Sequence, residues 1–194
     1  MCGFLTVGSK ELEIDVFDEA FLTLQKSGAS GAFLILNTTI NKSVENASDS
    51  RAGIYIKNME PNIISASTPT FTLLRGNSEL GRQNSVALHT QWQMEFDTKD
   101  AEYYHMPIQT YLKNSSVELS KQYFWSDPFM LPDTSEEITL CVMPVISKSG
   151  EVYGVCGFEV SSMLFKLSHM PSNITYPRLF IMFSPIQNEK INTK

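Results

Sequence analysis

Residues 123–160, with the sequence YFWSDPFMLPDTSEEITLCVMPVISKSGEVYGVCGFEV, decide the fold of this chain. Residues 122–129, 137–146 and 151–160 are rich in β-branched and aromatic residues, which favour strands. Residues 147–150, SKSG, supply the small polar side chains of a tight turn between the last two of these segments. The stretch therefore predicts one strand followed by a long antiparallel hairpin.

Two glycines lie inside the last of these strands, Gly154 and Gly157. A glycine within a strand usually marks a bend, or a place where another group approaches the sheet closely. We expect a helix or a ligand to lie over this part of the sheet.

The first third of the chain adds a helix and two strands. Residues 15–26 predict an amphipathic helix, because Asp15 can cap it, Ser27-Gly28 can end it, and apolar side chains recur at helical spacing: Val16, Phe17, Ala20, Phe21 and Leu24. Residues 31–37 (GAFLILN) form a continuous apolar run, the pattern of a strand buried on both faces. A polar loop at 38–50 separates it from a second strand at 51–58.

The middle of the chain has weaker signals. Residues 61–69 read as a turn-rich connection, and residues 71–76 as a short strand or turn. The pattern over residues 79–97 is ambiguous. Residues 100–112 have near-helical spacing of aromatic side chains, but Pro107 should limit helix length, so this region is expected to hold short helices and loops.

The C-terminal part predicts a helix at 161–168 and a final strand at 178–184. These elements together predict an α+β fold: a PAS-like central antiparallel sheet with an N-terminal helix and a helical or loop insertion over one face. We expect one domain over residues 1–172. Residues 173–194 then form a C-terminal extension with a strand, which we interpret as the start of a second module.

Composition excludes some classes of partner. The 194 residues carry a net charge of −6, and the 15 Lys and Arg residues form no basic stripe, so nucleic acid is not an expected partner. No apolar run approaches the roughly 20 residues that span a bilayer. No metal or other cofactor is expected, because Cys2, Cys141 and Cys156 lack metal-ligand spacing. Cys141 and Cys156 can be neighbours across the hairpin, and we expect buried free thiols rather than a disulfide.

The segment from Tyr123 resembles the core of bacterial extracytoplasmic Cache sensor domains, including the membrane-distal module of tandem Cache receptors. The resemblance rests on a Trp-Ser-x-Pro-aromatic run, an apolar strand ending in proline, and a glycine-rich strand ending in an acid. The matching positions are Trp125, Ser126, Pro128, Phe129, Pro144, Gly150, Gly154, Val155, Gly157 and Glu159. With the two upstream strands, the resemblance covers roughly residues 15–168.

The resemblance implies a ligand pocket between the sheet and the insertion. In similar domains that bind amino acids, an arginine takes the carboxylate, an acid takes the ammonium group, and aromatic rings cover the side chain. Here Glu159 stands at the acidic position, Tyr103 and Tyr104 at the paired aromatics, and Phe129 near a later ring. Ala101 stands where the arginine would fall, which leaves the ligand class open.

Three further residues complete the expected ligand-binding set. His105 follows the tyrosine pair and can donate to a ligand oxygen. Tyr123 and Trp125 lie in the matched segment, where strand alternation puts them on one face. For each of these aromatics, packing in the core is the alternative to ligand binding, and for Glu159 it is exposure at a strand end.

We expect the chain to be the small-molecule sensing domain of a bacterial transmembrane receptor, such as a histidine kinase, chemoreceptor or cyclase, and not an enzyme. Its expected partner is a small polar metabolite: an amino acid, an amine or a carboxylate. The expected location is the extracytoplasmic side of the cell membrane, reached only through segments outside this chain. A homodimer through the N-terminal helix is also expected.

Two other classes stay open. The opening Met1-Cys2-Gly3 looks like the start of class II glutamine amidotransferases, in which loss of Met exposes a catalytic N-terminal cysteine. The sequence shows no counterpart of that family's further segments after Gly8. The third class is a cytoplasmic PAS-like module that binds a protein partner and no ligand.

Overall fold

A computed structural model describes residues 17–40, 42–43, 45–59, 70–131, 134, 136–169, 186–187 and 190–191. The N-terminal helix is described over residues 17–27, which agrees with the prediction, and Phe17 and Leu24 on its inner face are buried. Gly28 ends it with a φ of +65°, a conformation that glycine adopts without strain. The Ser27 hydroxyl donates to the Leu24 carbonyl and so satisfies one of the last carbonyls of the helix.

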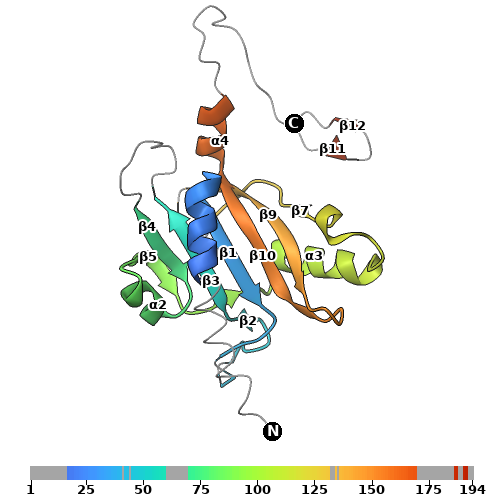
Figure 1. Cartoon of the computed structure of the whole chain (residues 1–194), viewed down its shortest axis with the longest axis horizontal. Coiled ribbons are helices and arrows are strands. Elements are labelled where there is room, and N and C mark those ends of the chain that lie inside the picture. Colours follow the sequence, from blue (N-terminus) through green and yellow to red (C-terminus); the bar gives the residue numbers. More distant parts are fainter. Residues whose placement is uncertain are drawn as a thin grey trace, which may run out of the picture.

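The central sheet has eight strands in the order β5-β4-β3-β1-β10-β9-β7, with β8 paired to β9 (Figure 1). All neighbouring pairs are antiparallel except β4 and β5, so the sheet is mixed. The strands are β1 (Gly31–Leu36), β3 (Gly53–Asn58), β4 (Phe71–Arg75), β5 (Ala87–Gln93), β7 (Phe124–Trp125), β8 (Phe129–Met130), β9 (Glu137–Ile146) and β10 (Val152–Ser161). This arrangement is consistent with the predicted PAS-like α+β class.

The strand β1 lies at the middle of the sheet, between β3 and β10, and all six of its residues are buried. That burial explains why its sequence is a continuous apolar run rather than an alternating one. The polar segment after it returns through β2 (Ser50–Arg51), which pairs with β6 (Phe96–Asp97) outside the central sheet.

The predicted hairpin is confirmed as β9 and β10. The Ser147 amide donates to the Glu151 carbonyl, and Gly150 takes a φ of +86° in the turn, as a glycine can. The predicted strand at 122–129 is wrong in extent. The segment follows η1 (Leu119–Lys121) and is divided into β7 and β8, because Pro128 has no amide hydrogen for a ladder and the Ser126 hydroxyl accepts from the Leu140 amide.

The glycines of β10 mark close approaches, but the expectation of a helix or a ligand over them is wrong, because the approaching groups belong to the neighbouring strands β1 and β9. A Cβ on Gly157 would lie 2.2 Å from the Cys141 carbonyl oxygen and 2.8 Å from the Phe33 ring. Gly154, with a φ of +152°, lies beside the Ile35 carbonyl at a register shift between β9 and β10. The missing side chain at Gly157 lets the Phe33 ring lie against the sheet.

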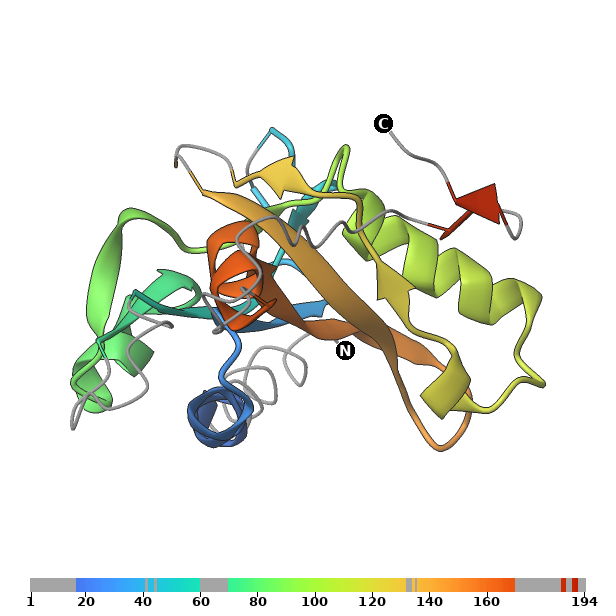
Figure 2. The same ribbon diagram turned by 90° about the horizontal axis from the view of Figure 1, so that it is seen from above.

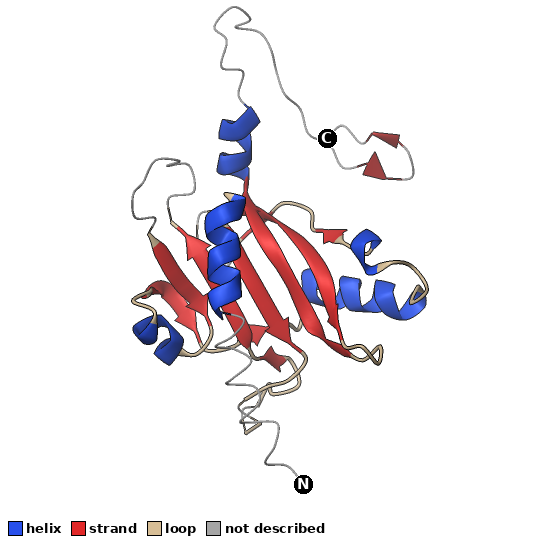
Figure 3. Cartoon of the chain, viewed as in Figure 1, coloured by secondary structure: helices blue, strands red, loops and turns tan. Residues whose placement is uncertain are grey.

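Helices cover both faces of the sheet (Figures 2 and 3). The N-terminal helix and α2 (Ser78–Gln83) cover the face that carries Ile54, Ile56 and Leu73. The helix α3 (Glu102–Lys113) covers the opposite face, over β9 and β10. The helix α4 (Ser162–His169) begins directly after β10 and confirms the predicted helix there.

The expectation of short helices over residues 100–112 is wrong, because α3 is a single helix with Pro107 inside it. Pro107 removes only one backbone hydrogen bond, and its ring is buried together with Tyr104. Burial of this face keeps the helix continuous. The ambiguous residues 79–97 contain most of α2, then β5 and β6.

The predicted connection at 61–69, the predicted strand at 178–184 and the expected boundary after residue 172 lie outside the described residues. A two-stranded ladder of β11 (Ile186–Gln187) and β12 (Lys190–Ile191) follows in the described part. No described helix is long and apolar enough to cross a membrane.

Candidate functional site

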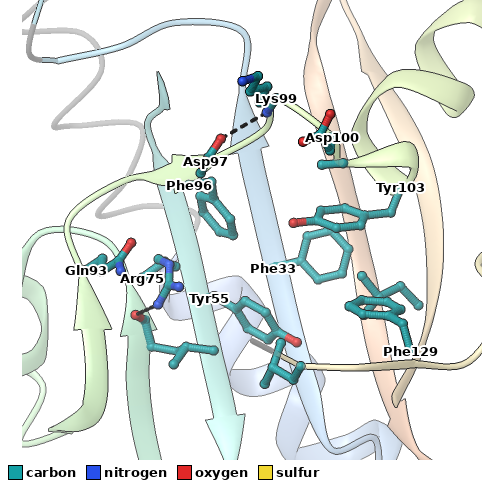
Figure 4. A pocket seen from close by; sticks show the side chains of 14 residues that line it. Phe33, Tyr55, Arg75, Gln93, Phe96, Asp97, Lys99, Asp100, Tyr103 and Phe129 are labelled. Atoms are coloured by element: carbon teal, nitrogen blue, oxygen red, sulfur yellow. Dashed lines mark hydrogen bonds between the residues drawn. The ribbon is translucent and has the colours of Figure 1, made fainter. Parts of the chain in front are cut away.

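A pocket of about 440 Å³ lies on the α3 side of the sheet, next to the start of that helix (Figure 4). This volume falls in the range of small-molecule sites. Its lining is mainly aromatic and aliphatic, with a few charged groups: Phe33, Tyr55, Leu74, Arg75, Gln93, Phe96, Asp97, Lys99, Asp100, Ala101, Tyr103, Phe129, Leu131 and Leu140.

Five aromatic rings from five elements surround the space. Phe33 and Tyr55 come from the adjacent strands β1 and β3, and their ring centroids are 5.5 Å apart. The Tyr55 ring stacks on Phe96, and the Tyr103 ring of α3 stacks on Phe129 of β8 at 6.0 Å. An apolar or aromatic ligand body would replace water against these rings.

Arg75 brings a positive charge to this lining from the end of β4. The strand register places it opposite Tyr55 on one side and Gln93 on the other. Its Nη1 donates to the carbonyl oxygens of Leu74 and Gln91, each at 2.8 Å, which fixes the guanidinium. A planar guanidinium held in place is suited to bind a carboxylate.

Tyr103 faces this charge across the pocket. Burial raises the pKa of its hydroxyl, the positive charge of Arg75 lowers it, and the charge of Asp97 raises it. The Tyr103 hydroxyl therefore stays protonated at neutral pH and can donate to a ligand oxygen.

The other charged groups of the lining lie at its exposed rim. Asp97, Lys99 and Asp100 are all exposed, and the Asp97 carboxylate accepts a hydrogen bond from the Lys99 amide. Water and salt screen charges of this kind, so they contribute less to binding than a partly buried arginine does.

Beneath the Tyr55 ring lies a buried ionic cluster on the same face of the sheet. Glu159 is 0% exposed and Lys57 is 1% exposed. The Lys57 Nζ lies 2.8 Å from the Glu159 Oε1 and also contacts the carboxylate of the half-exposed Glu136. The Tyr55 hydroxyl donates to the Glu159 Oε2. Burial, and then the Glu159 charge, raise the pKa of Tyr55 well above its usual value, so the phenol remains a donor.

The structure places two of the predicted site residues, Tyr103 and Phe129, in the pocket lining. Glu159 lies under the pocket and reaches it only through Tyr55. Tyr104 is buried beside it, where its hydroxyl donates to the Asn37 side chain and accepts from the Arg51 Nε. Tyr104 thereby ties α3 to the end of β1 and to β2.

The remaining predicted residues do not line the pocket. The His105 Nε2 lies 2.7 Å from the Thr98 carbonyl oxygen. Tyr123 and Trp125 are 58% and 52% exposed. Strand register explains the place of Trp125, because it pairs with Cys141, whose side chain points to the face opposite α3.

Sequence reasoning missed Arg75 and Lys57. Ala101 does line the pocket near the place where the resemblance suggested an arginine, while the arginine itself comes from β4. Lys57 is a charged residue at a strand position whose neighbours on the same face are buried. A lysine inside the predicted strand RAGIYIKN was the one signal that could have indicated a buried ion pair.

A second pocket of about 270 Å³ adjoins the first and shares Gln93, Phe96 and Asp97 with it. Its acid Glu95 accepts hydrogen bonds from the Thr39 hydroxyl, the Ile40 amide and the Ser50 hydroxyl. Glu95 therefore holds the loop after β1 against the strand connection before β6.

Neither the cysteines nor the possible metal ligands form a further candidate site in the described part of the chain. Cys141 and Cys156 are free, as expected, but the expectation of burial is wrong, because Cys141 is half-buried and Cys156 is exposed. Cys156 pairs with Met143 and Cys141 with Phe158, so the two thiols are not directly opposite. No group of three or more described His, Cys, Asp or Glu side chains is arranged to hold a metal ion. Cys2 lies outside the described residues.

The fold and the pocket together define an α+β domain with a pocket of small-molecule size on the α3 side of its sheet. Comparison with known proteins adds no closer assignment, since no family model matches the chain and a search of curated proteins finds no match.

Proposed function

We propose that this chain is a sensing domain that binds a small carboxylate-bearing metabolite in the pocket next to α3. The observation that carries the proposal is the guanidinium of Arg75, fixed by two main-chain carbonyls at the edge of an aromatic pocket. Arg75 would take the ligand carboxylate, the Tyr103 hydroxyl would add a hydrogen bond, and the rings would cover the ligand body. Arg75 thereby fills the role for which Ala101 is unsuited.

The Cache resemblance supports a wider context for this pocket. We propose that the domain is the extracytoplasmic input of a bacterial transmembrane receptor and that it binds its ligand without catalysis. The N-terminal helix is the proposed dimer contact, and its Leu22 is 47% exposed. A receptor ligand must bind one of two states more tightly in order to shift their populations.

The path of the signal would run along β10 into α4. The Ser30 amide and hydroxyl both donate to the Glu159 carbonyl, at 2.9 and 3.0 Å, and the Ser30 hydroxyl accepts from the Ser161 amide. The Ser161 hydroxyl in turn accepts from the Leu164 amide and so caps α4. A ligand that moves Tyr55 and Glu159 would thus act on the start of this helix.

A thermal-shift screen against carboxylates, amino acids and amines tests the proposed function. A ligand at 100 times its Kd stabilises the folded state by about 2.7 kcal/mol, which corresponds to a rise in Tm of about 5–10 °C for a domain of this size. We expect Arg75→Met to abolish the shift given by carboxylates. The matched control is Arg82→Met, which removes an exposed arginine of α2 and should leave the shift unchanged.

Three outcomes would contradict the proposal. No shift with any compound would favour the alternative of a protein-binding PAS-like module. A shift that Arg75→Met leaves intact would place the ligand elsewhere. Glutaminase activity lost in Cys2→Ala would support the amidotransferase alternative.

A further inference from the structure

We propose that the pocket selects carboxylates that lack an ammonium group, and that Lys57 determines this selectivity. The inference rests on the proposed function and narrows its ligand class. An amino acid would need an acid to receive its ammonium group, and the acid at the expected position, Glu159, already has protein donors at both carboxylate oxygens.

Both carboxylate oxygens of Glu159 have protein donors. The Oε1 accepts from the Lys57 ammonium group at 2.8 Å and the Oε2 from the Tyr55 hydroxyl. Glu159 is 0% exposed and does not line the pocket. The Tyr55 ring does line it, and Figure 4 shows that ring among the pocket side chains. A ligand ammonium group could reach Glu159 only by displacing Tyr55 or Lys57.

The sheet is built around this ion pair. Lys57 of β3 and Glu159 of β10 are both register partners of Gly31 in β1, so they meet across a residue without a side chain. A Cβ on Gly31 would lie 3.2 Å from the Glu159 Oε2 and 3.0 Å from the Tyr55 ring. Glycine at this position leaves room for the carboxylate and the phenol together, which makes the pair part of the folded state.

The least exposed charge of the pocket lining is positive. Arg75 is the charged lining residue that is only partly exposed, while the acids Asp97 and Asp100 lie at the exposed rim. A ligand ammonium group among the five rings would lose its hydrogen bonds to water, and no carboxylate of the pocket interior would replace them. The ligand class that fits is therefore a monocarboxylate with an aromatic or apolar body.

The test compares 3-phenylpropionate with L-phenylalanine, two probes that differ only in the α-ammonium group. Isothermal titration calorimetry on the full chain should give a Kd about tenfold or more lower for 3-phenylpropionate, because one unpaired polar group costs about this much or more in affinity. Equal or tighter binding of L-phenylalanine would overturn the inference.

Lys57→Met tests the assigned residue. Removing the lysine leaves the Glu159 charge without its cation, so the preference for 3-phenylpropionate should fall at least severalfold or reverse. The matched control is Lys148→Met, at an exposed position in the β9–β10 turn outside the pocket lining, which should keep the wild-type preference. Circular dichroism checks that each variant is folded.

A second variant covers the case in which Lys57→Met does not fold. Glu159→Gln removes the acid but keeps Lys57, so the preference for 3-phenylpropionate should be kept or increased. A fall in that preference would show that Glu159 does receive the ammonium group and would overturn the inference. If neither probe binds the wild type while other carboxylates bind through Arg75, the proposed function stands and the aromatic ligand class is wrong.

Discussion

Tyr55 takes part in both the pocket and the buried ionic cluster. Its ring lines the pocket and stacks on Phe96, while its hydroxyl donates to the buried Glu159 carboxylate. A hydrogen bond to a charged acceptor contributes about 1.5–3 kcal/mol to stability. One residue therefore couples the surface that a ligand would touch to the ion pair beneath it.

Tyr55→Phe should lower the free energy of unfolding by about 1.5–3 kcal/mol at pH 7. The folded state raises the pKa of Tyr55, so this stabilisation is fully present below the unfolded value near 10 and is lost as pH rises above it. The difference between wild type and variant should shrink above about pH 10. Urea unfolding at several pH values measures it, with the exposed Tyr153→Phe as control. A difference that does not depend on pH would contradict this account.

Single residues were the least predictable from sequence. Glu159 was selected as a site acid, but its burial and its pairing with Lys57 depend on β1 lying between β3 and β10. Arg75 has no local motif at all. Arg75 reaches the pocket because β4 pairs with β3 on one side and β5 on the other. Pairing between strands leaves no short-range signal in the sequence.

Elements with strong local signals were predicted well. The N-terminal helix, β1 and the β9–β10 hairpin follow from periodicity, an apolar run and turn residues. The helix α3 was not predicted as one element, because Pro107 argues locally for a break while burial against the sheet keeps the helix continuous. For the segment around Pro128 the prediction was too regular: its aromatic residues suggested one long strand, whereas its backbone forms two short ones.

Gly157→Ala tests the close packing of β10 against its neighbours. A methyl group there would clash with the Cys141 carbonyl and the Phe33 ring, so the backbone or the ring must move. We expect a loss of about 1–3 kcal/mol in the free energy of unfolding, or several degrees in Tm. Because Phe33 lines the pocket, carboxylate binding should also weaken. Unchanged stability and binding would show that the Phe33 ring is not held by this contact.

For the whole molecule, the order of helix, two strands, insertion and hairpin was enough to predict an α+β fold with a central sheet and an insertion over one of its faces. The chemistry of the pocket could not be predicted in this way, because its lining combines residues from β1, β3, β4, β5, β6, β8, β9 and the start of α3. Only the assembled sheet shows that the arginine comes from β4 and that the expected acid is paired. The resemblance implied a pocket between the sheet and the insertion with the acid Glu159 in it, whereas the pocket on that side is lined by Arg75 and Glu159 lies beneath it.

The central claim is that a carboxylate binds between Arg75 and the aromatic rings. The most direct measurement is a titration of ¹⁵N-labelled protein with 3-phenylpropionate, followed by amide chemical shifts. We predict that the largest changes cluster at Phe33, Arg75, Phe96, Ala101 and Tyr103, and that they disappear in Arg75→Met. Changes confined to the opposite face, around Ile54 and Leu73, or changes that persist in Arg75→Met, would contradict the claim.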